Sequence, residues 1–359
     1  MKIAYIIPSL NKKGPIIVVK EIVNGLIKLG ISKNDIIIYY FDESKGVDFP
    51  VKTKKIKFWD KIYKDNEYDI IHSHMIRPDI FLLKEIIINK ILFKNIKFNS
   101  VSTLHQRNFE NFYYETHNYL FSVLISKLWE FILSFFDKIV VLSESMKSYY
   151  KERIIHSKEK IVVNYNGRTI PDFNKNEIEK FHGSQTKCIL LGSVCNINKR
   201  KNLDKVIMAI KDLENAEYYI IGDGPEKYKL QNMVNELKIK NRVHFIGFKN
   251  NVLDYFQLFN IFILPSKSEG MSLSLIEAAA MKKTIICSKI DANLDMFNVN
   301  EAIFIDSDDI DGIKNAIYIA ANSDQYSKAA YKKYIEKYTG IAMARRYYEL
   351  YSDLVKEKE

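Results

Sequence analysis

Short apolar runs alternate with segments of helical periodicity along nearly all of this 359-residue chain. In the first half, strands are predicted at residues 2–7, 36–41, 69–74, 98–104, 138–142 and 160–163, and helices at 16–29, 77–90, 109–136 and 144–153. Parallel neighbours need a connection long enough to hold a helix, so this alternation favours a parallel sheet covered by helices. The first half is therefore predicted to be one α/β domain.

The same alternation resumes after a polar interval at residues 164–186, which contains Gly167, Pro171 and Gly183 and which we interpret as a domain boundary. Beyond it, strands are predicted at 188–191, 218–221, 243–246, 261–264, 284–287 and 302–305, and helices at 203–213, 226–237, 272–281 and 309–321. The second half thus repeats the α/β pattern of the first.

These patterns predict two Rossmann-like domains, an N-terminal one at 1–167 and a C-terminal one at 168–338. A length of 359 residues is also long for a single core. The tail at 339–359 holds one amphipathic helix, at about 341–354, with no strand after it. We expect this helix to pack back on the N-terminal domain.

Cysteine usage indicates a reducing compartment. Cys188, Cys195 and Cys287 are odd in number and contain no pair at metal-ligand spacing. Residues 1–8 are too short an apolar run for a signal peptide and are predicted to be a first strand. We therefore expect a cytoplasmic protein.

No membrane span is predicted either. The most apolar segment, 119–136, is interrupted by Lys127 and Glu130 and falls short of the ~20 apolar residues that a spanning helix needs. The protein is expected to be soluble, or peripheral on the inner face of the cell membrane.

The formal net charge of +10 is concentrated in the first half, where residues 1–167 hold 26 Lys and Arg against 18 Asp and Glu. No nucleic-acid-binding motif accompanies it, so nucleic acid is not an expected partner. A lysine cluster at 52–64 surrounds Phe58 and Trp59. With the aromatic region 109–136 it allows two interpretations: contact with an anionic membrane, or a solvated helix beside an internal core helix.

The most informative stretch is 260–280. Its apolar run 261–264 is followed by Pro265, a small polar loop and a helix predicted from Ser272. The free N–H groups and positive dipole end of such a helix can hold a phosphate. Glu269 in the loop and Glu277 in the helix flank that point, which predicts a nucleotide-sugar site. A helix-capping pair is the alternative, although capping boxes use a different spacing.

These residues resemble retaining glycosyltransferases of family 4. Glu269-Gly270 through Glu277 resembles that family's paired-glutamate motif, and Gly222-Asp-Gly-Pro225, Val243-His-Phe-Ile-Gly247, Asn166-Gly167 and His105 support the resemblance. It implies the GT-B fold, in which two Rossmann-like domains face a central cleft. It also implies metal-independent transfer from a nucleotide-diphosphate sugar, such as a UDP-sugar, to a saccharide or lipid-linked saccharide acceptor, in capsule, O-antigen or exopolysaccharide synthesis.

The resemblance assigns most donor contacts to the C-terminal domain. Glu277 would accept hydrogen bonds from the ribose, Glu269 would contact the transferred sugar, and Lys201 would neutralise the leaving diphosphate. The backbone N–H groups of the loop would hold the diphosphate, which adds Gly270, Met271, Ser272, Leu273 and Ser274 to the donor site. Relatives often have an arginine directly after the residue matching Gly192, whereas this chain has Ser193, so Lys199 or Arg200 would supply that contact. The alternative for Lys201 is a solvated basic helix start.

In the N-terminal domain, the resemblance implies that His105 faces the donor sugar and acceptor. It also implies that Gly14, in the first strand-to-helix loop, lets the backbone approach the diphosphate. Structural roles for both residues are the alternatives. His72 and His74 are two apart on a strand and share a face, but two ligands make a poor metal site.

Asp306-Ser-Asp308 matches an Asp-x-Asp metal motif of another glycosyltransferase fold. Here it precedes a predicted helix, where acidic residues favour the dipole, so we interpret it as structural. Two other functions stay open: a sugar-nucleotide epimerase of similar shape, and a non-catalytic relative that binds a partner transferase.

Overall fold

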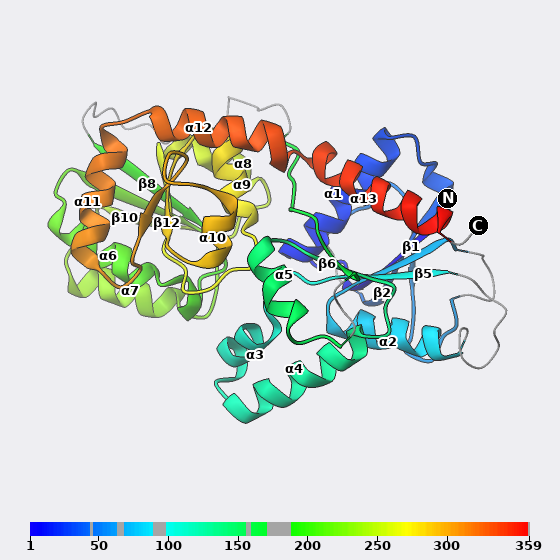
Figure 1. Cartoon of the computed structure of the whole chain (residues 1–359). Helices are drawn as coiled ribbons and strands as arrows, with labels where there is room; N and C mark the ends of the chain where they lie inside the picture. The colour runs from blue at the N-terminus through cyan, green and yellow to red at the C-terminus, as the bar shows by residue number, and fades with distance from the viewer. Residues whose placement is uncertain (44–45, 63–67, 89–97, 156–158, 171–187, 358–359) are drawn as a thin grey trace. The chain divides into compact units, whose positions relative to one another are not determined.

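The computed structural model describes residues 1–43, 46–62, 68–88, 98–155, 159–170 and 188–357. They form two compact units: unit 1 is Met1–Thr169 with Tyr338–Glu359, and unit 2 is Ile170–Lys337 (Figure 1). Most of the polar interval 164–186, the end of the predicted helix 77–90 and Lys64 of the lysine cluster lie outside the described residues.

Unit 1 contains a seven-stranded sheet in the order β3-β2-β1-β4-β5-β6-β7. The strands are β1 (Ile3–Ser9), β2 (Ile36–Asp42), β3 (Lys52–Lys55), β4 (Ile70–His74), β5 (Asn99–Thr103), β6 (Lys138–Val141) and β7 (Ile161–Val163). Every pairing is parallel. All residues of β4 and β5 are buried, as expected for central strands covered on both faces.

The helices of unit 1 are α1 (Gly14–Lys28), α2 (Ile76–Ile86), α3 (Asn108–Thr116), α4 (Tyr119–Leu133), α5 (Glu144–Lys151) and α13 (Gly340–Lys356). α1 and α2 make crossovers in opposite directions along the sheet, so right-handed connections place them on opposite faces. The C-terminal helix α13 lies beside α1 (Figure 1). The approach is so close that a Cβ on Gly25 would lie 2.2 Å from Cβ of Ala344. The tail helix therefore belongs to the N-terminal domain, as predicted.

One interpretation left open for unit 1 and one prediction were wrong. A solvated helix was one of the two interpretations of the lysine cluster, but Lys52–Lys55 is the exposed edge strand β3. Lysines on an edge strand discourage pairing with another chain, which accounts for part of this charge without a ligand. The helix predicted at 109–136 is two helices, because His117 adopts a left-handed conformation between α3 and α4.

Unit 2 contains a six-stranded parallel sheet in the order β10-β9-β8-β11-β12-β13. Its strands are β8 (Ile189–Val194), β9 (Ala216–Ile221), β10 (Val243–Gly247), β11 (Ile261–Leu264), β12 (Thr284–Ser288) and β13 (Ile303–Ile305). Its helices are α6 (Leu203–Asp212), α7 (Lys227–Glu236), α8 (Val252–Tyr255), α9 (Leu273–Ala280), α10 (Asp291–Met296), α11 (Ile310–Ala321) and α12 (Gln325–Lys333). The prediction missed α8 and α10, which are short, and α12, which is mostly polar.

The prediction of two Rossmann-like domains is confirmed. The three cysteines are free thiols. Within the described ranges, no helix is both long and apolar enough to cross a membrane.

Candidate functional site

The predicted strand–loop–helix of unit 2 is confirmed. β11 is buried throughout, Pro265 ends it, and α9 begins at Leu273 after the N-cap residue Ser272. The hydroxyls of Ser272 and Ser274 lie 3.0 Å apart, and the Ser272 side chain does not cap the helix. Gly270, Met271, Ser272 and Ser274 are all buried, while Leu273 is partly exposed. The backbone of this loop is therefore packed into the unit just before a helix N-terminus.

The carboxyl ends of β8 and β11 meet at this loop. β8 pairs with β9 on one side and with β11 on the other, so the strand order reverses at the β8–β11 boundary. Open α/β sheets bind ligands beyond the carboxyl ends of strands at such a switch point. Lys201 follows β8 and Glu269 follows β11, so the two residues come from the two sides of this boundary.

Lys201 and Glu269 form a buried ion pair, with Nζ 2.5 Å from Oε1 and both side chains less than a tenth exposed. Arg200 adds a second cation, with Nη1 3.5 Å from Glu269 Oε2. Burial acts to raise the pKa of Glu269, but Lys201 and Arg200 outweigh it and the pKa is lowered. Glu269 is thus an ionised carboxylate beside two cations, and the three groups together carry a net positive charge.

Lys201 lies in a short 3₁₀ helix, η4 (Lys199–Lys201), ahead of α6. Since its side chain is buried, the interpretation as a solvated helix start was wrong. Sequence reasoning gave Lys201 and Glu269 separate roles and missed their contact. The signal available was that both follow strands that adjoin in a doubly wound sheet.

Lys199 and Arg200 were the two residues expected to take the place of an arginine at position 193, and Arg200 is the one that lies with Lys201 and Glu269. Arg200 Nη1 also donates to the carbonyl oxygen of Ser268 at 2.5 Å. Lys199 is exposed. Ser193 is fully buried, and its hydroxyl contacts the carbonyl oxygen of Ile263 at 2.5 Å and the hydroxyl of Tyr218 at 2.6 Å. The position after Gly192 therefore serves the core of unit 2.

Glu277 lies on α9 and is buried. Side chains on a helix lean toward its N-terminus, which places the Glu277 carboxylate on the loop side of its own Cα. Gly222 has a positive φ of 139°, and a Cβ there would lie 1.9 Å from the carbonyl oxygen of Cys195. This glycine thus allows the turn after β9 to pack against the loop that leads to Arg200 and Lys201.

The acidic segment before α11 makes local contacts. The Asp309 side chain accepts the Gly312 N–H at 3.0 Å and caps the helix. Asp308 pairs with Lys267 at 3.2 Å. In the part of the chain that the structure describes, no group of three or more His, Cys, Asp or Glu side chains is arranged to hold a metal ion.

In unit 1, His105 follows β5 and its Nε2 lies 2.9 Å from Nδ1 of His74 at the end of β4. Sequence reasoning missed this partnership, although parallel pairing of β4 with β5 aligns His74 with Thr103, two residues before His105. Burial lowers the pKa of His105 to about 3, and it also lowers the pKa of His74 and His72 well below the usual value. The three imidazoles are therefore neutral at physiological pH.

The predicted shared face of His72 and His74 is confirmed, because their ring centroids are 4.3 Å apart. His72 has a structural role: its Nδ1 lies 2.6 Å from the Tyr351 hydroxyl of α13, and its Nε2 lies 2.8 Å from the Thr103 hydroxyl. His74 Nε2 is a buried atom without a hydrogen-bond partner among the described residues.

Gly14 is the first residue of α1, so its assignment to the preceding loop was wrong. Asn166-Gly167 serves the packing of unit 1, since a Cβ on Gly167 would lie 2.3 Å from the carbonyl oxygen of Thr339.

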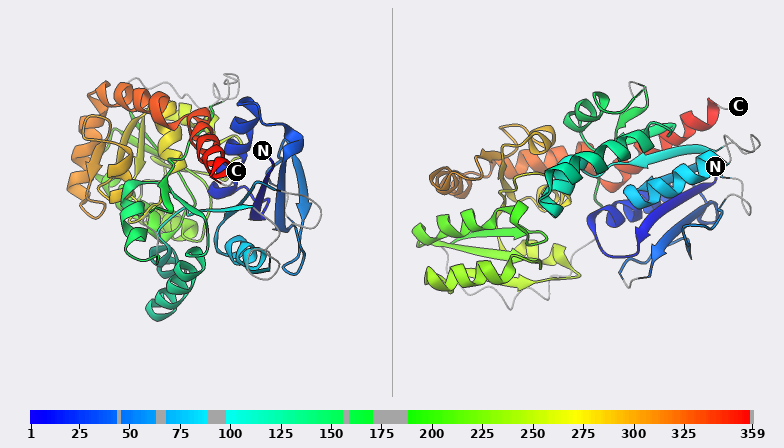
Figure 2. Two further views of the ribbon diagram at one scale, coloured as in Figure 1. Left: turned by 45° about the vertical axis from the view of Figure 1, so that its right-hand side comes forward. Right: turned by 90° about the horizontal axis from the view of Figure 1, so that it is seen from below.

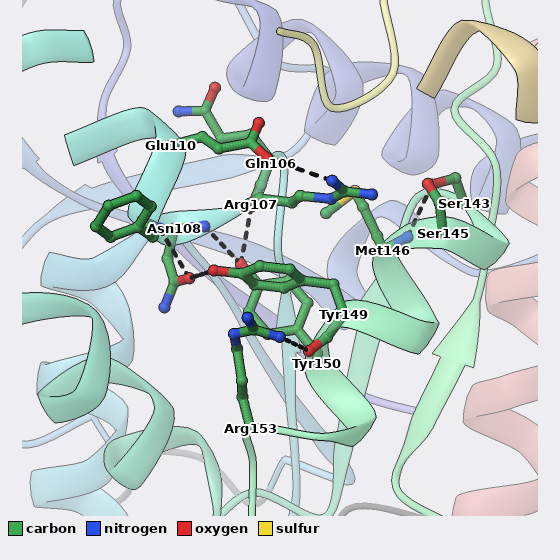
Figure 3. Close-up of polar contacts among 11 residues, drawn as sticks. Gln106, Arg107, Asn108, Glu110, Ser143, Ser145, Met146, Tyr149, Tyr150 and Arg153 are labelled. Carbon is green, nitrogen blue, oxygen red and sulfur yellow. Dashed lines mark hydrogen bonds and ion pairs between the residues drawn. The ribbon is translucent and has the colours of Figure 1, made fainter. Parts of the chain in front are cut away.

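Beyond β5 and β6, a polar cluster joins residues 106–110 to α5 (Figure 3). In it the Arg153 guanidinium lies 3.8 Å from the centre of the Tyr149 ring.

Two family models match the chain. One, described as glycosyl transferases group 1, matches residues 174–338, and the other, described as glycosyltransferase family 4, matches residues 38–169. The chain is 30% identical over 364 residues to the O-antigen biosynthesis glycosyltransferase WclY of Escherichia coli, and the match covers 99% of each chain.

A second relative is the UDP-Gal:alpha-D-GlcNAc-diphosphoundecaprenol alpha-1,3-galactosyltransferase of Escherichia coli, 24% identical over 316 residues that cover 83% of this chain and 79% of that protein. Among solved structures, Anabaena Alr3699/HepE in complex with UDP and glucose is similar in fold, with a TM-score of 0.79 at 13% identity over 98% of this chain and 99% of that one. The relative matched along its full length, with the two parallel sheets and the two family models, identifies the group. The chain belongs to the GT-B glycosyltransferases.

Proposed function

We propose that the chain transfers a sugar from a nucleotide-diphosphate sugar to a hydroxyl acceptor, with retention at the anomeric carbon, during assembly of a cell-surface polysaccharide. The observation that carries this proposal is the Lys201–Glu269 pair beside the N-terminus of α9, at the switch point of unit 2. A pre-placed cation and a helix N-terminus stabilise the charge that develops on a departing diphosphate. The named activities of the O-antigen and galactosyl relatives support this reaction class.

Uridine diphosphate is the proposed leaving group, because UDP occurs in the name of the galactosyltransferase relative and in the Alr3699/HepE complex. The backbone of Gly270 to Ser274 would hold the diphosphate, and Glu277 would accept hydrogen bonds from the ribose. Lys201 and Arg200 would face the phosphates. When Lys201 turns toward the phosphates, an oxygen of Glu269 would become available to accept a hydrogen bond from a hydroxyl of the sugar.

In the reaction itself, the bond from the anomeric carbon to the phosphate oxygen breaks and the acceptor oxygen bonds to the same face of the sugar. The departing phosphate oxygen takes the acceptor proton. His105 would contact the sugar as a neutral imidazole. Gly14, at the start of α1, keeps its proposed role in backbone approach to the diphosphate.

Calorimetry with UDP and with the matching guanosine, adenosine and cytidine diphosphates tests donor recognition. We expect UDP to bind most tightly, Glu277→Ala to weaken binding at least tenfold, and His105→Ala to keep binding but lower turnover. Failure of every nucleotide to bind would favour a non-catalytic role. Isomerised donor without any transfer would favour an epimerase.

Two further parts of the proposal have direct tests. Retention predicts that proton NMR shows the same anomeric configuration in donor and product.

Metal independence predicts that excess EDTA leaves the rate unchanged, since Lys201, Arg200 and α9 would stabilise the leaving charge. An inverted product, or activity lost to EDTA and restored by a divalent ion, would contradict the respective part.

For the acceptor we propose a saccharide carried on a lipid, such as the diphosphoundecaprenol of the galactosyltransferase relative's name. Such an acceptor would place the protein in the cytoplasm and on the inner face of the membrane. Transfer to a lipid-linked saccharide that far exceeds transfer to the same free saccharide would support this choice, and equal rates would contradict it.

A further inference from the structure

Helix α4 carries large apolar residues on its exposed side as well as on its buried side. The buried side holds Trp129, Ile132 and Leu133 together with the polar residues Ser122, Ser126 and Glu130. The exposed side, with the residue just beyond the helix, carries Tyr119, Leu120, Phe121, Leu124, Leu128, Phe131 and Phe135. Leu120 and Leu124 are 73% and 70% exposed. We call these seven residues the outer face of α4. A helix at a water-facing surface normally carries polar side chains on its exposed side, so the apolar outer face needs an explanation.

Hydrogen bonds fix this orientation from within. Trp129 Nε1 donates to Oδ2 of the buried Asp79 at 2.7 Å, which ties α4 to α2. Asn108 Nδ2 donates to Oε1 of Glu130 at 3.1 Å and to the carbonyl oxygen of Ser126 at 3.2 Å. Rolling α4 to bury the outer face would break all of these contacts and expose the partners.

Asn108 is itself anchored to α5. Its backbone N–H donates to the Tyr150 hydroxyl at 2.9 Å, and its Oδ1 accepts from the Tyr149 hydroxyl at 3.0 Å (Figure 3). The α3–α4 hairpin is therefore held at the sheet of unit 1 by a continuous set of polar contacts, and its outward apolar side is a built feature of the fold. In the left view of Figure 2 the hairpin (teal) projects at the bottom of unit 1.

The exposed Trp59 lies on the same side of the sheet. Lys84 of α2 donates from Nζ to the carbonyl oxygens of Phe58 at 2.9 Å and Asp60 at 2.5 Å, and α2 packs against α4. Trp59 is 81% exposed, and the neighbouring Lys57 and Lys61 are also exposed. The Trp59 segment and α4, which are far apart in the sequence, thus both contact α2.

We propose that the outer face of α4, with Trp59, docks onto an anionic lipid surface. The charge pattern selects lipid over a protein partner: Lys127 is the exposed charge of α4, and the helix's one carboxylate, Glu130, is turned inward and bonded to Asn108. Lys57 and Lys61 flank Trp59, and among the residues that the structure describes Asp60 beside it and Glu115 of α3 are exposed acids. Aliphatic and aromatic side chains bordered by lysine suit the boundary between acyl chains and anionic headgroups.

The docking surface specifies how the membrane contact of the proposed function is made, and its biological purpose rests on that proposed function. Docking itself requires no sugar transfer, so the two can fail separately. Loss of UDP binding with vesicle binding intact would contradict the proposed function alone. UDP binding without vesicle binding would contradict the docking surface alone.

Flotation of the full chain with phosphatidylglycerol-containing vesicles, and with phosphatidylcholine vesicles, tests the proposal. We expect binding to the anionic vesicles at low salt and much less at high salt. Replacing Leu124, Leu128 and Phe131 together by Ser should lower the partition coefficient at least tenfold. Lys57→Ala and Lys61→Ala should each lower it roughly fivefold.

The matched control replaces Tyr228 and Val299, which are 79% and 72% exposed in unit 2, by Ser. This variant should bind vesicles like the wild type. Circular dichroism and the thermal midpoint confirm that every variant folds. No flotation of the wild type at low salt, or an equal loss in the control, would overturn the proposal. A dimer by light scattering that only the triple variant dissociates, without flotation, would assign the face to a second copy instead.

Discussion

Two buried carboxylates, one in each unit, have opposite acid–base character. Glu269 of unit 2 lies between Lys201 and Arg200, and its pKa is lowered in spite of burial. Asp79 of unit 1 accepts hydrogen bonds from Ser73 at 2.6 Å, Ser102 at 2.9 Å and Trp129 at 2.7 Å. Burial raises the pKa of Asp79 to about 7, although these three donors oppose the rise.

The difference shows what decides the charge of a buried acid. Desolvation disfavours the charged form of both carboxylates; the two cations beside Glu269 outweigh it, whereas the three neutral donors to Asp79 do not. Unit 2 therefore has ionised side chains, those of Lys201, Arg200 and Glu269, at the carboxyl edge of its sheet. Unit 1 has neutral imidazoles at the corresponding edge, in His74 and His105. We infer that charge stabilisation belongs to unit 2 and that unit 1 contributes shape and hydrogen bonding.

Removing the cation from unit 2 should have the largest effect. Lys201→Ala leaves Glu269 buried without its nearest cation, which costs about 3–5 kcal/mol of unfolding free energy for a buried pair. Urea denaturation of the variant measures it. Lys199→Ala, which removes an exposed lysine two residues earlier, is the stability control and should change the value by less than about 0.5 kcal/mol. Equal losses of unfolding free energy in the two variants would show that the buried Lys201–Glu269 pair contributes no more to stability than an exposed lysine does.

The two carboxylates should also give opposite pH dependence. Asp79 has a folded pKa above its unfolded value of 3.8, so its favourable contribution is complete at low pH and is lost as pH rises toward 7. The loss is at most about 4 kcal/mol, at ~1.4 kcal/mol for each pKa unit. Asp79→Asn should therefore flatten the fall of unfolding free energy between pH 4 and 7.5. An unchanged slope would contradict the raised pKa.

Glu269 has a lowered pKa, and its contribution should be present above its unfolded pKa, near 4.5, and lost as pH falls through the folded value. Glu269→Gln should remove that acid-side loss. A similar loss below pH 4.5 in the variant would assign the effect to other carboxylates.

His74 should act as a positioning residue for His105. His74→Phe removes the partner of His105 Nε2, and a buried polar group left without its hydrogen bond costs about 1–3 kcal/mol. We expect kcat to fall about tenfold with little change in UDP affinity, and His74→Gln to recover part of the loss. In a His105→Ala background the His74 change should have no further effect. If the kcat losses of the His74 and His105 substitutions multiplied in the double variant, a role of His74 through His105 would be contradicted.

The smallest expected loss of unfolding free energy concerns the attachment of α13. Tyr351→Phe removes the hydroxyl that contacts His72 Nδ1 at 2.6 Å and the Tyr5 hydroxyl at 3.0 Å. The loss should be about 1–3 kcal/mol of unfolding free energy because both partners are buried. Tyr348→Phe, on the exposed side of α13, is the control and should be nearly neutral. Similar values for the two variants would show that this buried network adds little to the stability of unit 1.

Much of this protein could be derived from local patterns. Alternating apolar strands and helices predicted both parallel sheets, because burial on two faces requires continuous apolar runs. The segment from Ile261 to Ala280 predicted its own strand, loop and helix start, since proline, small polar residues and apolar periodicity act over a few residues. The wrong predictions lay where tertiary context overrides such patterns: Lys52–Lys55 is an edge strand, and a turn at His117 divides the aromatic region 109–136 into two helices.

Tertiary structure alone decided which side chains meet. Lys201 and Glu269 are separated by 68 residues, and His74 and His105 by 31, so their contacts depend on which strands adjoin. The orientation of α4 is of the same kind, because both of its sides carry apolar residues. Contacts with Asn108 and Asp79, which belong to other elements, hold Glu130 and Trp129 on the inward side. Periodicity specifies that a helix has two sides, and contacts from distant parts of the chain decide which of them faces inward.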